Sequence, residues 1–182
     1  MQAEELYYLL KPFCELGEVE GRTTAQKIFY LLQSHGYPTR LDYFLHYYGP
    51  YSEDLTSFLR FASASEPSLL EEQQVDVGPD AVRFDYRPTD DATELIQALE
   101  TKIITDEQKQ TVARFCEVAR HLKSQSAVRL ELAATILYFE KERGYNRLQA
   151  SKKTQAMKPR KADADSMQAA GDLLTEIAHQ AA

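Results

Sequence analysis

The sequence predicts a mainly α-helical protein with a winged helix-turn-helix-like core, in which one short β-hairpin is embedded in a larger helical body. Three observations predict this class. Apolar residues recur at helical spacing in segments that cover most of the 182 residues. Apolar and polar residues alternate in one stretch only, at about residues 73–87. The order of helices followed by a hairpin is that of a winged helix-turn-helix domain.

Four helices are expected before the hairpin. The first covers residues 3–16, and the second begins at a capping-box pattern formed by Thr23 and Gln26. A short helix from Thr39 to Tyr48 has apolar residues at positions i, i+3, i+4 and i+7, and it would be the recognition helix of the motif. Ser52 caps the next helix, because its hydroxyl can accept a hydrogen bond from the first turn.

The hairpin and a second group of helices follow. The hairpin turns at Gly78-Pro79-Asp80, whose residue types favour a tight turn. A last helix begins near Asp163 or Asp165, which we interpret as an N-cap. We expect a single domain over residues 1–182, with a winged-helix-like region at about 1–88 and a helical region at about 89–182. The helical region is expected to contain helices near 89–100, 105–122 and 126–143 and a basic connector at 147–161.

Composition narrows the cellular setting. No run of apolar residues is long enough to cross a membrane, and the acidic start MQAEELYYLL lacks the pattern of a signal peptide. We therefore expect a cytoplasmic protein that does not contact membranes. Cys14 and Cys116 lie far apart inside apolar helical patterns, which predicts free buried thiols instead of a disulfide.

The charge is unevenly distributed along the chain. The formal net charge is -7, and twelve acidic residues fall between Glu66 and Glu107. Such a surface disfavours a phosphate backbone as a general partner. The stretch from Arg147 to Lys161 has six basic residues and no acidic one. We interpret it either as a solvated connector or as the place where nucleic acid would be contacted, through Lys152, Lys153, Lys158, Arg160 and Lys161.

No catalytic or cofactor pattern is present. The sequence contains no H-E-x-x-H, C-x-x-C pair, G-x-S-x-G or Walker motif. Its four histidines stand alone, and each is interpreted as a core or surface residue. We expect a protein that is not an enzyme and that binds neither a metal nor a cofactor.

An aromatic stretch, KIFYLLQSHGYPTRLDYFLHYYGPYSEDL, is unlike the rest of the chain. Its rings could form the core of the helical domain or an exposed surface for a partner, since tyrosine combines a large apolar ring with a polar tip. For the second interpretation, the residues expected to face outward are Arg40, Tyr43, His46, Tyr47 and Tyr51.

The same stretch resembles a known family. The motif Gln26-Lys27-Ile28-Phe29-Tyr30-Leu31, followed by Tyr48-Gly49-Pro50-Tyr51-Ser52, is similar to the signature of the uncharacterised YwgA-like proteins. More loosely, it resembles the Panacea domain of toxin-antitoxin and prophage-associated proteins. The resemblance implies a winged-helix-like, α-rich fold and a role in neutralising a partner protein. Its signature residues here are Gln26, Lys27, Tyr48, Gly49, Pro50 and Ser52.

Two functions are consistent with the sequence. The preferred hypothesis is an interaction module, antitoxin-like or prophage-associated, that binds and regulates another protein, for example a toxin from a neighbouring gene. The alternative is a winged-helix DNA-binding transcriptional regulator. Its recognition helix would have few cations, and this disfavours the alternative because phosphate contacts dominate affinity for DNA. Whether the protein forms a homodimer is left open.

Overall fold

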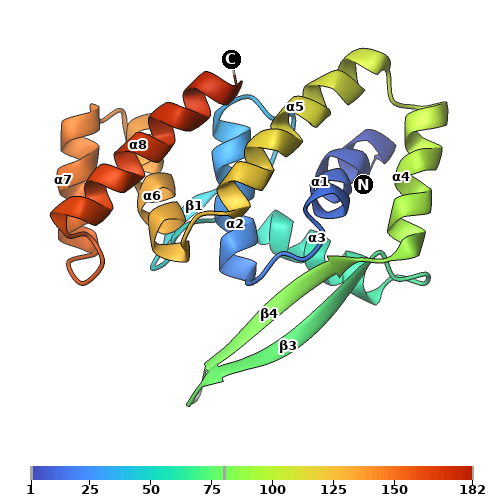
Figure 1. The fold of residues 1–182 in the computed structure, drawn as a ribbon, viewed down its shortest axis with the longest axis horizontal. Helices are drawn as coiled ribbons and strands as arrows, with labels where there is room; N and C mark the ends of the chain where they lie inside the picture. Colours follow the sequence, from blue (N-terminus) through green and yellow to red (C-terminus); the bar gives the residue numbers. More distant parts are fainter. Residues whose placement is uncertain (1, 80, 182) are drawn as a thin grey trace.

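A computed structural model describes residues 2–79 and 81–181. Over these residues the protein is mainly helical, with helices α1 to α8 and two small antiparallel hairpins, β1–β2 and β3–β4 (Figure 1). The predicted mainly helical class is therefore confirmed. The prediction of a single hairpin is wrong, because a second hairpin lies inside the aromatic stretch.

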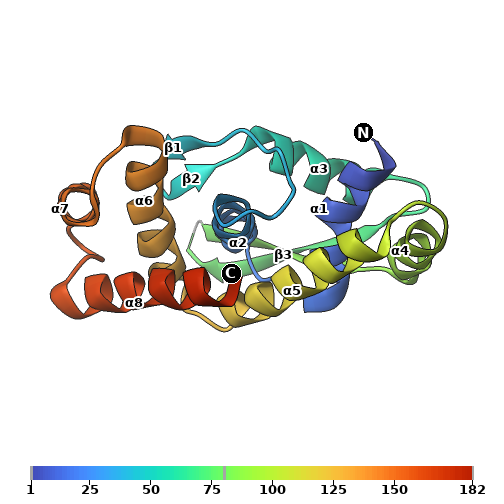
Figure 2. The same cartoon turned by 90° about the horizontal axis from the view of Figure 1, so that it is seen from above.

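Helix α2 (Arg22–Ser34) lies at the centre of the molecule. Figure 2 shows it nearly end-on, with the other elements arranged around it. Every residue from Ala25 to Leu32 is buried, which explains the apolar side chains on both sides of this helix. The helix begins after Gly21, so the predicted capping box between Thr23 and Gln26 is wrong. The Gln26 side chain bonds to a distant segment instead.

Two of the helices predicted near α2 are confirmed. Helix α1 (Ala3–Leu16) continues through Pro12 and ends before Gly17, which has a positive φ. Helix α3 (Glu53–Ala64) begins after Ser52, whose Oγ accepts a hydrogen bond from the backbone N–H of Leu55 at 3.3 Å. The start of α3 follows from local chemistry, since the serine hydroxyl satisfies a free N–H group of the first turn.

The predicted helix from Thr39 to Tyr48 is wrong. Strand β1 (Phe44–His46) pairs with strand β2 (Gly49–Tyr51) in antiparallel register, and Tyr47 and Tyr48 form the turn between them. An isolated helix of this length is marginal, and a run of aromatic residues packs well as strand. The motif therefore lacks its recognition helix, and the winged helix-turn-helix core is not confirmed.

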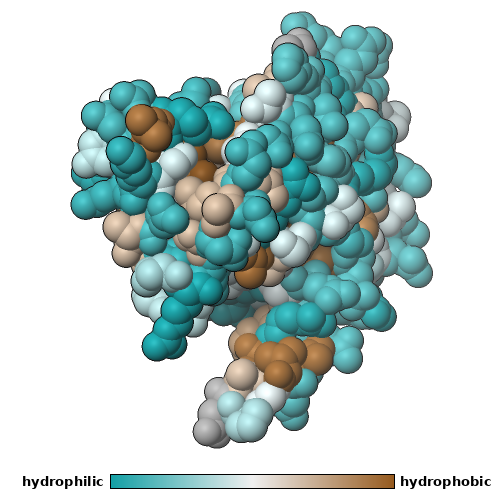
Figure 3. Space-filling view, turned by 60° about the vertical axis from the view of Figure 1, so that its left-hand side comes forward, coloured by the Kyte–Doolittle hydropathy of each residue, from teal (hydrophilic) through white to brown (hydrophobic). Residues whose placement is uncertain are grey.

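The second hairpin is the predicted one. Strands β3 (Leu70–Gly78) and β4 (Ala81–Pro88) extend away from the helices, and Figure 3 shows apolar side chains on this arm, where Val77 and Val82 are exposed. At its base, Val19 and Tyr86 exchange two backbone hydrogen bonds of 2.8 and 3.0 Å. Of the predicted Gly78-Pro79-Asp80 turn, Asp80 lies outside the described residues.

Three further helices begin where the sequence predicts. They are α4 (Asp90–Lys102), α5 (Asp106–Lys123) and α6 (Ala127–Arg143), and their N-caps are Thr89, Thr105 and Ser126. Each cap side chain accepts a hydrogen bond from the first turn of its helix. Helix α6 is buried without interruption over residues 130–139, in agreement with its apolar sequence.

The stretch expected to be a basic connector, residues 147–161, is mostly helical. Most of this stretch forms helix α7 (Arg147–Met157), which begins with a capping box between Asn146 and Gln149. The helix buries only Ala150 and Thr154, so it has almost no apolar stripe for a sequence pattern to detect. Helix α8 (Ala164–Ala181) follows, and Asp163 accepts a hydrogen bond from the N–H of Ser166 at 2.8 Å, as predicted for an N-cap.

Buried apolar side chains from all of these helices form one cluster. Cys116 is buried and Cys14 is half-buried, and both are free thiols, as predicted. Within residues 2–79 and 81–181, no helix combines the length and the hydropathy needed to cross a membrane.

Candidate functional site

Four buried polar side chains fix the β1–β2 hairpin to the helical body. They are Gln26 and Lys27 from α2, Glu131 from α6, and Lys158, which follows α7. Each of these residues is at most 6% exposed. We call this group the buried polar cluster. Because burying polar groups is costly unless they are paired, the partners of each side chain show what the cluster holds in place.

The two residues of α2 bind the backbone of β2 and of the residue after it. The Gln26 side chain donates to the carbonyl of Ser52 at 2.8 Å and accepts from the N–H of Ser52 at 2.8 Å. Lys27 Nζ donates to the carbonyl oxygen of Pro50 at 2.6 Å. These three bonds give the end of the hairpin one position relative to α2.

Of the other two residues, Lys158 binds the turn, and Glu131 binds Lys158. Lys158 Nζ donates to Glu131 Oε1 at 2.6 Å and to the carbonyl oxygen of Tyr47 at 2.6 Å. Lys161 Nζ donates to Glu131 Oε2 at 2.8 Å. Burial opposes the ionisation of Glu131, but the two ammonium groups outweigh it and hold the pKa of this carboxyl below its usual value.

Three lysines and one carboxylate set the charge of the buried polar cluster beneath the hairpin. Three lysines, Lys27, Lys158 and Lys161, surround the carboxylate of Glu131. Burial lowers the pKa of Lys27 to about 7; Glu131 offsets part of this effect and Lys158 adds to it. The Lys27 ammonium group is therefore partly deprotonated at neutral pH.

Gly49 is required where the hairpin touches the helices. Its φ of +89° is one that other residues rarely adopt. A Cβ atom at this position would lie 2.8 Å from Thr135 Oγ1 and 3.3 Å from Lys27 Cε. The glycine of the Tyr48-Gly49-Pro50 signature thus permits both the turn and the close approach of β2 to α6.

The opposite side of the hairpin exposes aromatic rings. Tyr47 is 73% exposed, Tyr48 48% and Phe44 45%. The rings form a continuous series of contacts with centroid separations of 5.0 to 6.1 Å, and its members are Phe44, Tyr51, His46, Tyr48 and Tyr47. We call this series the aromatic hairpin. The ammonium groups of Lys158 and Lys161 lie 5.8 and 5.5 Å from the ring centroids of Tyr47 and Tyr48.

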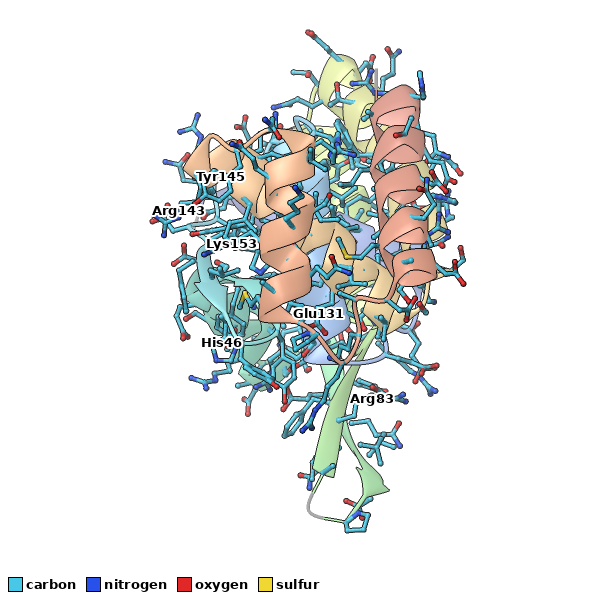
Figure 4. All side chains as sticks on the ribbon, turned by 90° about the vertical axis from the view of Figure 1, so that its left-hand side faces the viewer. His46, Arg83, Glu131, Arg143, Tyr145 and Lys153 are labelled. Carbon is cyan, nitrogen blue, oxygen red and sulfur yellow. The ribbon has the colours of Figure 1, made fainter. Side chains whose placement is uncertain are left out.

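Basic residues of α6 and α7 lie on the same side of the molecule as the aromatic hairpin. Figure 4 shows His46 below Lys153, with Arg143 and Tyr145 further along this side. Lys153 and Arg143 are exposed. The face therefore combines aromatic rings with positive charge, although the protein as a whole is acidic.

The residues predicted to bind a partner are divided between two surfaces. Tyr47 and His46 are exposed on the hairpin, and Tyr51 is half-buried, with its hydroxyl accepting from Thr56 at 2.7 Å. Tyr43 is half-buried against the ring of Tyr30, at a centroid distance of 4.9 Å.

Arg40 lies elsewhere. It lines a cavity of about 650 Å³ whose other walls include Glu4 and Glu5 at the start of α1. The single outward face expected for these residues depended on a helix from Thr39 to Tyr48, and it is absent because the helix is absent.

The residues predicted to contact nucleic acid are also divided. Lys152, Lys153 and Arg160 are exposed, whereas Lys158 and Lys161 are bound to Glu131. Sequence reasoning missed Glu131, the residue that organises these lysines. Its signal was a single acidic residue inside the apolar run LELAATILYF, since a charge in a buried helix requires a partner.

No metal centre is found in the part of the chain that the structure describes. Within residues 2–79 and 81–181, His, Cys, Asp and Glu side chains form no group of three or more that could hold an ion. His121 Nε2 lies 3.0 Å from Glu176 Oε2, and His35 Nδ1 lies 2.7 Å from the carbonyl oxygen of Leu31.

Comparison with known proteins gives the family. No family model matches the sequence. The chain is 32% identical over 132 residues to the uncharacterized protein YwgA of Bacillus subtilis (strain 168), which covers 72% of each chain. The chain belongs to the YwgA family. In this YwgA-family protein, the signature residues far apart in the sequence meet at one place, where α2 and α6 hold the β1–β2 hairpin.

Proposed function

We propose that this protein is a non-enzymatic interaction module that binds a partner protein through the aromatic hairpin. The observation that carries the proposal is the contrast between the two sides of β1–β2. Gln26, Lys27 and Lys158 hold the inner side by buried hydrogen bonds to its backbone, while Tyr47 and Tyr48 are exposed on the outer side.

This arrangement suits recognition because a fixed surface loses little entropy on binding. Tyrosine rings also supply much contact area with few rotatable bonds, and they are enriched among the residues that contribute most to binding. Exposed aromatic rings that bound no partner would lower the solubility of the protein, because they leave apolar surface in contact with water.

The lysines close to the aromatic hairpin all have partners within the fold, so the proposal gives them a structural role and not a catalytic one. Lys27 is bound to Pro50, and Lys158 and Lys161 are bound to Glu131. The bonds from Lys27 and Lys158 to backbone carbonyls hold the hairpin in position. In this proposal the chain acts by occupying a surface of its partner.

The biological setting of the proposal comes from the looser resemblance to the Panacea domain. We infer an antitoxin-like or prophage-associated role in the cytoplasm, in which the partner is a toxic protein encoded by a neighbouring gene. Binding would neutralise or regulate that protein.

Co-expression with the products of the neighbouring genes tests the proposal. One product is expected to co-purify with the chain and to inhibit growth when it is expressed alone. Changing Tyr47→Ala or Tyr48→Ala should weaken the complex by about 2 kcal/mol each, as for anchor residues. Phe61→Ala is the matched control, because Phe61 is 50% exposed but lies on α3. The proposal fails if the tyrosine variants bind as tightly as the control.

A further inference from the structure

Strand β1 has a free edge. Among the described residues, β1 and β2 form a two-stranded sheet, and no third strand pairs with either. Figure 2 shows β2 between β1 and α2, in agreement with the packing of β2 on α2 and α6. The helical body therefore covers the outer edge of β2 and leaves the outer edge of β1 open.

The backbone groups on this edge are those of Leu45. Leu45 is opposite Pro50, which has no N–H, and the carbonyl of Pro50 is bound to Lys27 instead of to β1. The pair is thus the non-hydrogen-bonded one of the hairpin, and the N–H and C=O of Leu45 point away from β2. Within residues 2–79 and 81–181, no hydrogen bond reaches Leu45 from outside the hairpin.

The edge is short, with three residues, but it has no lysine, proline or bulge. Edge strands are commonly blocked by a lysine, a proline or a bulge, since open N–H and C=O groups recruit other strands. In β1 the three residues are Phe44, Leu45 and His46, and the proline of the hairpin is on β2. An extended peptide could therefore pair with Leu45 while its side chains contact the neighbouring rings.

Charge indicates the kind of peptide. Lys153 lies on the same side as His46 (Figure 4), and Lys152 and Arg160 are exposed on or just after the same helix. From Arg143 to Lys161 the sequence has no acidic residue. Acidic side chains on an incoming strand would be attracted to this segment, and basic ones would be repelled.

We propose that an extended acidic segment of a partner protein binds as a third strand on the free edge of β1, with its carboxylates toward Lys152, Lys153 and Arg160. This inference rests on the proposed function and specifies its partner. A single-stranded nucleic acid fits less well, because it has no amide groups to pair with Leu45.

Selection from a displayed library of random peptides on the purified full-length chain tests the inference. The selected peptides are expected to be rich in Asp and Glu and in β-branched residues. Leu45→Pro should weaken their binding at least about tenfold, because proline removes the N–H but is tolerated on an edge strand. Leu45→Ala is the matched control, since it shortens the same side chain and keeps the N–H; it should change the affinity less than about threefold.

The charge is tested separately. Lys152→Glu with Lys153→Glu should reduce the affinity of the selected peptides about tenfold at low salt and less at high salt. Unchanged circular dichroism and thermal midpoint confirm that each variant folds. The inference is overturned if the library yields no binders, if the binders are not acidic, or if Leu45→Pro has no more effect than Leu45→Ala.

Oligouridylate provides the last comparison. Binding of this RNA more tightly than any selected peptide, with sensitivity to the lysine variants, would also overturn the inference in favour of nucleic acid. The proposed function is judged independently, since a protein complex that depends on Tyr47 and Tyr48 but not on the N–H of Leu45 would retain it without the third strand.

Discussion

Lys158 and Glu131 form an ion pair of 2.6 Å whose side chains are 4% and 6% exposed. The same ammonium group donates to the carbonyl oxygen of Tyr47, a residue 111 positions away in the sequence. One buried lysine therefore joins helix α6 to the exposed turn of the aromatic hairpin. The stability of the fold and the position of the candidate binding surface depend on the same contact.

Removing the carboxylate of this pair should be strongly destabilising. We expect Glu131→Leu to lower the free energy of unfolding by about 3–5 kcal/mol, because it leaves the Lys158 ammonium group buried without a counter-charge. Urea denaturation measures the change. Glu142→Leu on the same helix is the control, since Glu142 is exposed and should matter by less than about 0.5 kcal/mol. Adding Lys158→Met to Glu131→Leu should recover much of the loss; equal stability of single and double variants would contradict the pairing.

Substitution of Gly49 should be costly. Gly49→Ala places a Cβ atom 2.8 Å from Thr135 Oγ1 on a backbone with φ +89°. The strain and the overlap together should reduce stability by about 2–4 kcal/mol. Gly171→Ala is the contrasting change, because Gly171 lies inside α8 with open space around it, and it should stabilise by about 0.5–1 kcal/mol. Thermal midpoints of both variants check the prediction, which fails if they shift in the same direction.

Lys27 should make the protein more stable as the pH rises above neutral. Burial lowers its pKa in the folded state to about 7 from an ordinary value near 10.5. Above pH 7 the unfolded chain therefore binds more protons than the folded one, so the free energy of unfolding rises with pH, by at most about 1.4 kcal/mol per unit. The window ends near pH 9, because burial raises the pKa of Cys14 to about 11 and that of Cys116 to about 12, which reverses the sign.

Urea titrations across the range from neutral pH to about pH 8.5 measure this slope. Lys27→Met is the control, because methionine keeps much of the side-chain volume and has no proton to exchange. The variant should have a nearly flat profile over the same range. A wild-type profile that is flat, or that falls as the pH rises, would show that Lys27 keeps its proton in the folded state.

Neither thiol should react readily in the native protein. Burial raises the pKa of both Cys14 and Cys116, so the thiolate that attacks disulfide reagents is scarce at pH 8. We expect both thiols to react with an aromatic disulfide reagent in urea and neither to react within minutes in native buffer. The variant Ser124→Cys, at an exposed position after α5, provides a reactive thiol for calibration. Rapid native reaction of Cys116 would contradict its burial.

Local chemistry in the sequence determined most of the helical framework. Ser52 and Asp163 were recognisable as caps, and the helix starts at Thr89, Thr105 and Ser126 were located, because a cap and its first turn lie within a few residues of one another. Alternation similarly located β3–β4, whose strands are adjacent in sequence. Helix α7 was missed because it packs through Ala150 and Thr154 and shows no periodic apolar stripe.

Tertiary contacts decided the site. Residues 39–48 have apolar side chains at helical spacing, yet residues 44–51 form a hairpin, because Lys27, Gln26 and Lys158 bind this segment from distant parts of the chain. The sequence by itself marked Tyr48-Gly49-Pro50 as part of a signature and predicted a helix from Thr39 to Tyr48. Only the folded structure pairs Glu131 with Lys158, since the free energy of a buried charge depends on which group lies beside it and not on the residues next to it in sequence.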